Sequence, residues 1–241
     1  RDHYGVRMVS YLQNIKTFNS IVRGPPLLYE IFKWIIQKPS VLSVSPSLVH
    51  VFTKSSLKLK IPDLEYVMSP ASFKEGSVGL LDTVSGMTLG VWQTRPKSNG
   101  YVKINSKNMH EPPIINPNYL SDPYDVDVLL KSIKIGRNLL STSPLQPYLN
   151  GKTNPSNDLQ TDDELLSWAR NEGITVYHMI GTAKMGPKSD KLAVVNNKLK
   201  VRGIESLRVA DASIMPTMPS GNTNAPTMMI AEKASDMILG K

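Results

Sequence analysis

Apolar side chains recur at helical spacing in the first part of the chain. This spacing predicts helices over 5–23 and 26–37, interrupted by Gly24, Pro25 and Pro26. The second stretch, PLLYEIFKWIIQK, is apolar with basic residues between its apolar positions. Packing against the body of the protein is the simpler explanation for this stretch, and lying on a membrane surface is the alternative.

After the breakers Pro39 and Pro46, the pattern changes to one that is typical of strands. β-Branched and aromatic residues alternate in part with polar ones, which predicts a half-buried antiparallel sheet. We expect its strands at 48–54, 64–69, 87–95 and 100–106, with a turn at 96–100 joining the last two.

Helical spacing returns at 124–141 and again at 162–170. At the start of the second segment, Thr161 and Glu164 have the spacing of a capping box, which satisfies the first backbone N–H groups of a helix. The chain up to this point therefore predicts a sheet with helices, in one or two domains.

The part of the chain from Thr175 onward has a different character. A short apolar strand is expected at 206–211, ending in Asp211, and a loop of small polar residues follows at 216–226. A helix then begins, with Pro226 in its first turn and Asn224 at the N-cap position. Because the first N–H groups of a helix have no partners within it, this arrangement favours an anionic or electron-rich ligand in front of the helix.

Composition narrows the possible chemistry. The chain has no cysteine, which excludes thiol nucleophiles, disulfides and cysteine-based metal sites, so redox chemistry requires a bound cofactor. Its net charge is +8, but the lysines are spread along the chain without a nucleic-acid-binding motif, so we expect no nucleic-acid partner. No stretch reaches the ~18 apolar residues of a transmembrane helix, and the N-terminus does not resemble a signal peptide.

Two motifs occupy the region from Val176 to Asp236: YHxxGTxxMG and, after it, AVVxxxLxVxGxxxLRVxDASIMPxMPSGNTNAPTxMIAEKAxD. Together they resemble the C-terminal signature of the glucose-methanol-choline (GMC) oxidoreductases, nearest to the choline-dehydrogenase-like bacterial branch. Weaker similarity extends upstream, and the opening RDH resembles the middle of the family's NLxDH element. The family begins with a GxGxxG that binds the ADP part of FAD, and no GxGxxG occurs in this sequence.

The resemblance implies a fold of the α/β (α+β) class, the two-domain GMC fold, of which this chain would hold the C-terminal half. Residues 1–44 would link the FAD domain to the substrate domain, 45–165 would form an antiparallel-sheet substrate domain, and 166–241 would return to the FAD domain and carry the active site. The N-terminal Rossmann half would be absent. Because half of the cofactor site would be missing with it, we expect the isolated fragment to be inactive.

The same resemblance implies an activity and its residues. His178, in the YHxxGT motif, would be the catalytic base, and Asn222 would occupy the position of its partner. We hypothesise from its chemistry that Asn222 donates a hydrogen bond to the substrate oxygen without competing as a base. The helix after the SGNTN segment would point its N-terminus at the pyrimidine ring of the flavin. The cofactor would be FAD, contacted by Asp211, Ala212, Asn222, Thr223 and Asn224.

Chemistry gives independent reasons for these residue types. Oxidation of a primary alcohol to an aldehyde removes the hydroxyl proton and a carbon-bound hydride in different directions. A histidine with an unperturbed pKa of about 6.5 can accept the proton at neutral pH, and the hydride would pass to flavin N5. The other histidines, His3, His50 and His110, have no metal-ligand spacing, so we interpret them as structural or exposed and expect no metal site.

Three alternatives belong to other functional classes. A serine hydrolase would need a GxSxG elbow, which the sequence lacks. A GMC-type lyase would keep His178 without flavin reduction by alcohol, and a non-catalytic fragment would lack a complete FAD site.

The expected partners are a small-molecule alcohol and an electron acceptor, which is a quinone, a carrier protein or oxygen. The expected location is the cytoplasm or the periphery of the inner membrane.

Overall fold

The computed structural model describes residues 1–74 and 79–241, which form two compact units. Unit 1 comprises Arg1–Tyr4, Gln93–Val126 and Thr175–Lys241, and unit 2 comprises Gly5–Trp92 and Asp127–Ile174. Both units combine segments that lie far apart in the sequence. The boundaries expected after residues 44 and 165 divide the chain by the roles of its parts toward cofactor and substrate. The two units do not test these roles, so the boundaries stay a prediction.

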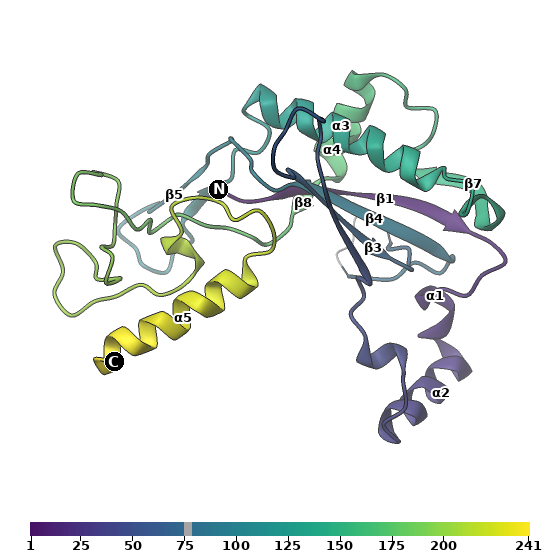
Figure 1. Cartoon of the computed structure of the whole chain (residues 1–241), viewed down its shortest axis with the longest axis horizontal. Helices are drawn as coiled ribbons and strands as arrows, with labels where there is room; N and C mark the ends of the chain where they lie inside the picture. The colour runs from purple at the N-terminus through teal and green to yellow at the C-terminus, as the bar shows by residue number, and fades with distance from the viewer. Residues whose placement is uncertain (75–78) are drawn as a thin grey trace. The chain divides into compact units, whose positions relative to one another are not determined.

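Unit 2 is built on a sheet with the strand order β2-β3-β4-β1-β7, and β8 also pairs with β1 (Figure 1). Antiparallel pairs join β2 to β3, β4 to β1 and β1 to β7. Alternation of β-branched and aromatic residues correctly predicted β2, β3 and β4. The strands are β1 (Tyr4–Leu12), β2 (Val49–Thr53), β3 (Leu64–Ser69), β4 (Gly86–Gln93), β7 (Leu149–Asn154) and β8 (Ile174–Thr175).

The helix expected over 5–23 is wrong for most of its length. Tyr4–Leu12 is strand β1, and only Phe18–Ile21 forms a helix, α1. Strand β1 lies between β4 and β7 and pairs with both, so its backbone N–H and C=O groups are satisfied by its neighbours. Its β-branched and aromatic residues suit a pleated surface, and pairing in the fold outweighed the local spacing.

One face of this sheet is covered by α3 (Pro123–Leu140), with α4 (Asp162–Glu172) on the same side (Figure 1). The hydroxyl of Tyr66 on β3 donates to the carbonyl of Ser132 on α3 at 2.8 Å. A Cβ atom on Gly136 would lie 2.1 Å from Cε of Met8, so a larger residue at this position would displace the Met8 side chain where α3 meets the sheet. The expected helices at 124–141 and 162–170 are confirmed.

The capping box at the start of α4 is also confirmed. The hydroxyl of Thr161 accepts a hydrogen bond from the backbone N–H of Glu164 at 3.2 Å, and the carboxylate of Glu164 accepts one from the backbone N–H of Thr161 at 2.9 Å. Two otherwise unpaired donors are satisfied in this way. A 3₁₀ turn, η2 (Gln146–Tyr148), precedes β7.

Helix α2 (Gly24–Ile35) confirms the helix expected at 26–37. Unlike a packed amphipathic helix, however, it exposes apolar side chains and buries a charged one. Leu28, Phe32 and Ile35 share one stripe and are 69%, 56% and 67% exposed. The buried residue is Glu30, whose carboxylate accepts from the backbone N–H of Val41 at 2.9 Å, at the start of the 3₁₀ turn η1 (Val41–Ser43). Within the described part of unit 2, the apolar stripe therefore faces outward.

In unit 1, β5 (Tyr101–Lys103) pairs only with β6 (Ile114–Asn116) among the described strands, in a separate two-stranded sheet. The expectation that the turn at 96–100 joins two strands of one sheet is therefore wrong. The carboxylate of Asp125 accepts from the backbone N–H groups of Lys97 and Ser98 at 2.9 and 2.7 Å. These bonds hold the segment as a loop, so β5 does not return alongside β4.

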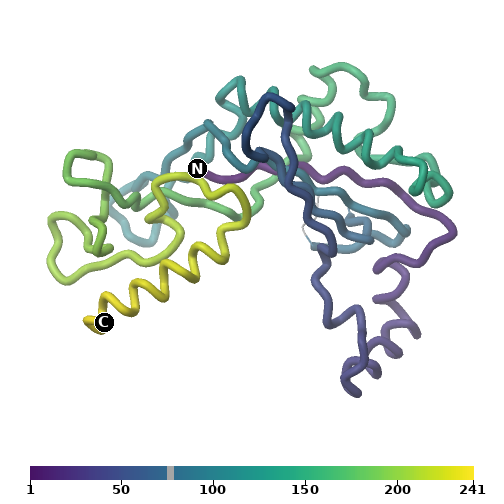
Figure 2. The backbone as a smooth tube through the Cα atoms, viewed as in Figure 1, coloured from purple at the N-terminus to yellow at the C-terminus, as the bar shows by residue number. Residues whose placement is uncertain are grey.

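The tail of unit 1 runs as loops, apart from η3 (Ala212–Ile214), until α5 (Asn224–Leu239) begins (Figure 2). The strand expected at 206–211 is wrong, because only an isolated bridge between Lys200 and Arg208 is present there. The helix near the C-terminus is confirmed with Pro226 in its first turn. Its N-cap is Thr223, one residue before the expected Asn224.

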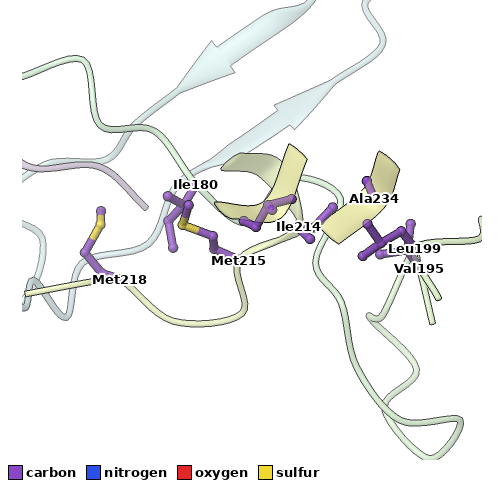
Figure 3. Close-up of a cluster of buried hydrophobic side chains, with 8 residues drawn as sticks. Ile180, Val195, Leu199, Ile214, Met215, Met218 and Ala234 are labelled. Atoms are coloured by element: carbon purple, nitrogen blue, oxygen red, sulfur yellow. The ribbon is translucent and has the colours of Figure 1, made fainter. Parts of the chain in front are cut away.

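A cluster of buried apolar side chains holds this tail together (Figure 3). Residues from the loops pack against α5, so the segment has a core despite its few regular elements. Of the tail's methionines, Met215 and Met218 belong to the cluster, whereas Met228 and Met229 are exposed. The cluster comprises Ile180, Val195, Leu199, Ile214, Met215, Met218, Ile230 and Ala234.

Candidate active site

The two motifs of the tail lie side by side. The backbone N–H of Ala183 donates to the carbonyl of Ser213 at 3.0 Å, and that of Met185 donates to the carbonyl of Ile214 at 2.8 Å. Ile180 and Ile214 also belong to the same apolar cluster (Figure 3). The segment that carries His178 is thus joined directly to η3, which follows Asp211.

The first three residues of the chain run alongside the His178 segment. Arg1 and Ile180 exchange two backbone hydrogen bonds, with N···O distances of 3.1 and 2.9 Å. The backbone N–H of Val176 donates to the carbonyl of His3 at 3.1 Å. Asp2 and His3 are therefore immediate neighbours of His178.

Asp2 fixes the backbone around His178. Its carboxylate accepts hydrogen bonds from the backbone N–H of His178 at 2.9 Å, from the hydroxyl of Thr175 at 2.6 Å and from the phenol of Tyr119. Burial, together with the hydrogen bond to Asp2, raises the pKa of Tyr119, so its phenol remains a donor. The three donors give the Asp2 side chain a single orientation.

A turn at Tyr177 directs His178 inward. Tyr177 has a φ of 61°, in the left-handed region, which costs on the order of 1–3 kcal/mol for a non-glycine residue. Its backbone N–H donates to the hydroxyl of Thr175 at 2.9 Å, and Asp2 holds the next N–H. As a result the side chain of Tyr177 is 62% exposed, whereas His178 is 9% exposed.

His178 is a neutral imidazole at neutral pH. Burial lowers its pKa from the ordinary 6.5, and the negative charge of Asp2 opposes this shift in part. Its Nδ1 lies 2.9 Å from Nδ1 of His3, and the two rings meet edge to face. A buried, neutral and oriented imidazole has the properties of a general base.

Sequence reasoning missed the groups that support His178. His3, which we interpreted as structural or exposed, is fully buried beside it, and neither Asp2 nor Tyr119 was singled out. The signal was the resemblance of the opening RDH to the NLxDH element. That resemblance indicated a place in the family fold but gave these side chains no role.

The other predicted site residues lie around the loop between η3 and α5. Asp211 accepts from the backbone N–H of Ser213 at 2.8 Å and so caps η3, and Ala212 is the first residue of that turn. Asn222 and Asn224 are exposed, and Thr223 is buried.

The side chain of Thr223 makes no capping hydrogen bond at the start of α5. A hydrogen bond from Nε of Arg95 to the hydroxyl of Ser220, at 2.7 Å, ties down the preceding loop. The first turn of α5 therefore keeps backbone N–H groups for an acceptor outside the helix.

A cavity of about 680 Å³ lies in unit 1 beside these elements. Its volume falls within the range of roughly 300–1,000 Å³ that is usual for sites of small molecules and cofactors. The lining combines the N-terminal segment, the residues of β5 and β6 and those next to them, the residues after His178 and the loop after η3. Among the residues that line it are Asp2, Met179, Gly181, Thr182, Pro216 and Thr217.

Comparison with known proteins identifies the family. A family model described as GMC oxidoreductase matches residues 96–231. The chain is 36% identical over 228 residues to an alcohol dehydrogenase (acceptor) of Pseudomonas putida, covering 93% of this chain and 40% of that protein. It is 38% identical over 192 residues to an oxygen-dependent choline dehydrogenase of Staphylococcus aureus, covering 79% of this chain and 33% of that protein. The chain belongs to the GMC oxidoreductase family.

Solved structures show the same fold. A formate oxidase of Aspergillus oryzae, studied for modification of its FAD, superposes with a TM-score of 0.87 at 22% identity over 99% of this chain and 46% of its own. A pyridoxine 4-oxidase of Mesorbium loti superposes with a TM-score of 0.79 at 21% identity, over 100% of this chain and 43% of its own. The fold class expected from the sequence is confirmed, and the chain spans less than half the length of these relatives.

Proposed function

We propose that this chain is part of an FAD-dependent dehydrogenase that oxidises a primary alcohol to an aldehyde, with His178 as the proton acceptor. The observation that carries the proposal is the buried, neutral His178, held by Asp2 at its backbone and by His3 at its ring, in the unit that contains the cavity. Membership of a family with alcohol and choline dehydrogenases supports the same reaction class.

The residues present fit one part of FAD. The first turn of α5 offers backbone N–H groups without a side-chain cap, which suits the electron-rich edge of a flavin ring. We propose that Asn222, Thr223 and Asn224 contact the flavin there, and that Asp211 and Ala212 contact the remainder of the cofactor. Bound FAD would supply the hydride acceptor of the reaction.

The roles of the chain's own side chains follow from their placement. Burial keeps His178 neutral, so it can accept the alcohol proton at neutral pH. Asn222 donates a hydrogen bond to the substrate oxygen and, as an amide, does not compete for the proton. In this proposal, residues 1–44 link the two domains, 45–165 bind substrate and 166–241 carry the catalytic groups.

The experiment joins this chain to the N-terminal half that its relatives carry and follows flavin absorbance without oxygen while primary alcohols, choline among them, are added. Bleaching by an alcohol, slowed about 10²–10⁴-fold in His178→Ala, would support the proposal. His110→Ala is the matched control, because His110 is an exposed histidine of the same unit. A full rate in His178→Ala would overturn the assignment of the base.

The same experiment separates the alternatives. A GMC-type lyase would hold FAD that no alcohol bleaches, and a non-catalytic fragment would remain colourless even with its N-terminal half. Repeating the turnover with a quinone, a carrier protein or oxygen identifies the electron acceptor. We favour a dehydrogenase over an oxidase because the two curated relatives described above are an alcohol dehydrogenase and a choline dehydrogenase.

We propose a peripheral membrane location for the protein. No helix in the described ranges 1–74 and 79–241 is long and apolar enough to cross a membrane. Helix α2, however, presents an outward apolar stripe with Arg23 and Lys38 at its ends, and its one acidic residue, Glu30, is turned inward and paired with Lys33 at 2.8 Å. Apolar and basic groups without opposing acids complement an anionic lipid surface.

A further inference from the structure

A second histidine completes the surroundings of His178. His3 is 0% exposed, and both of its ring nitrogens have partners. Its Nε2 lies 3.0 Å from the carbonyl oxygen of Thr94, and its Nδ1 lies 2.9 Å from Nδ1 of His178. All three residues belong to unit 1.

These contacts determine where the protons are. A carbonyl oxygen only accepts hydrogen bonds, so Nε2 of His3 carries a proton and donates it to Thr94. A neutral His3 then has a lone pair on Nδ1. The contact between the two Nδ1 atoms contains one proton, so that proton is on His178, which donates to His3.

His3 remains neutral while His178 titrates. Burial lowers the pKa of His3 to about 4, well below the ordinary 6.5, although the hydrogen bond to Thr94 and the charge of Asp2 oppose the shift. A protonated His3 would also direct an N–H at the N–H of His178. The lone pair on Nδ1 of His3 is therefore maintained across the neutral pH range.

We propose that His3 is a positioning residue that fixes His178 in the tautomer with its proton on Nδ1 and its lone pair on Nε2. This inference rests on the proposed function, in which His178 accepts the alcohol proton. Histidine has two neutral tautomers, and only this one makes Nε2 the basic atom. After Nε2 accepts the proton, Nδ1 still donates to His3, so the pair also stabilises the imidazolium that forms.

Two substitutions of similar size separate this role from simple packing. In His3→Asn, the amide oxygen takes the place of Nδ1 and can still accept from His178. In His3→Leu, the acceptor is lost. We expect flavin reduction to slow about tenfold or more in His3→Leu, as for the loss of one hydrogen bond of about 1.4 kcal/mol, and to recover largely in His3→Asn.

The rate of flavin reduction should fall at low pH as His178 becomes protonated. The pH at which this acid limb of the profile lies is a readout that packing alone would not change. Among the described residues, the charged group that acts on both histidines is the carboxylate of Asp2, which also accepts from the titratable phenol of Tyr119, and neither group is altered in the two variants. Because His3→Leu removes the acceptor that stabilises the imidazolium, the limb should move to lower pH. In His3→Asn it should stay close to its original position.

The direct test is the nitrogen NMR spectrum of histidine-labelled protein, made with its N-terminal half and with the His178 signals identified by their loss in His178→Ala. We expect the proton on Nδ1 in the unaltered protein and in His3→Asn, and a shift toward Nε2 in His3→Leu. A proton on Nε2 in the unaltered protein, or an unchanged tautomer and pH profile in His3→Leu, would overturn the inference. The tautomer is read without turnover, so this result is distinct from a failure of His178 as the base.

Discussion

Asp2 combines two effects on His178 that can be measured separately. It holds the backbone N–H of His178 at 2.9 Å, and its negative charge raises the pKa of the imidazole against the larger lowering by burial. The first effect is geometric and the second is electrostatic. A substitution that removes the charge but keeps the shape should therefore change the pH dependence in a known direction.

The net effect of burial and Asp2 is a lowered pKa for His178, so the acid limb of flavin reduction, where the proposed base becomes protonated, should lie at lower pH than for a histidine with the ordinary pKa of 6.5. In Asp2→Asn the raising charge is gone, and the acid limb should lie at still lower pH. Stopped-flow rates at a series of pH values measure the acid limb of the unaltered protein and that of Asp2→Asn.

Tyr119→Phe is the control for this experiment. It removes one hydrogen bond to the Asp2 carboxylate but leaves the charge in place. In Tyr119→Phe, we expect the acid limb to lie closer to that of the unaltered protein than the acid limb of Asp2→Asn does. A limb that moves toward higher pH in Asp2→Asn would contradict the assigned electrostatic role.

At the scale of elements, α2 shows that one helical pattern is compatible with an apolar face that is buried or one that is exposed. Spacing predicted the helix, but the apolar stripe is turned outward and Glu30 is bound to Val41 and Lys33 on the inner side. Helical periodicity identifies an apolar face without saying which way that face points. The direction was decided by the hydrogen bonds at Glu30.

The outward stripe predicts binding to anionic lipid vesicles. With its N-terminal half present, the protein should sediment with vesicles that contain phosphatidylglycerol, less so at high salt, and only weakly with neutral phosphatidylcholine. The double substitution Phe32→Glu with Ile35→Glu should abolish binding, because it places charge on the apolar stripe. Co-sedimentation at matched lipid concentrations measures the effect.

A second pair of substitutions provides the control for vesicle binding. Ile104→Glu with Met109→Glu also adds two acidic groups at exposed apolar positions, which are 88% and 89% exposed in unit 1. We expect vesicle binding to persist in this variant. Loss of binding in both variants would mean that net charge, rather than α2, governs the association, and no binding by the unaltered protein would contradict the proposed location.

At the scale of the whole molecule, this chain spans 40% of its Pseudomonas putida relative, and its sequence contains no GxGxxG. The groups that we propose as cofactor contacts come from the η3–α5 loop and the first turn of α5. By family resemblance, these suit the flavin end of FAD, and the ADP end requires a dinucleotide-binding half. Affinity for the complete cofactor should then depend on both halves.

The chain by itself should therefore not retain FAD. After incubation with FAD and desalting, we expect a colourless chain, and a yellow protein when the N-terminal half is joined to it. His178→Ala in the joined protein should still be yellow, because the substitution removes the proposed base and none of the proposed FAD contacts. An isolated chain that holds FAD at a one-to-one ratio would show that the cofactor site is complete without the other half.

The sequence by itself predicted the features that depend on neighbouring residues. The strands β2, β3 and β4, the helices α3, α4 and α5, and the capping box of Thr161 and Glu164 all follow from local spacing. The motif around His178 likewise identified the family from the sequence alone, because it is a continuous run of residues.

Only the tertiary structure decided the features that depend on distant partners. Strand β1 has neighbours on both sides, which outweighed its helical spacing, and β5 left the main sheet because Asp125 holds the preceding loop. His3 and His178 are 175 positions apart in the sequence, and their contact exists because the first residues run beside the tail. Local patterns contain no information about such pairings, since the hydrogen bonds that fix them form only once the chain has folded.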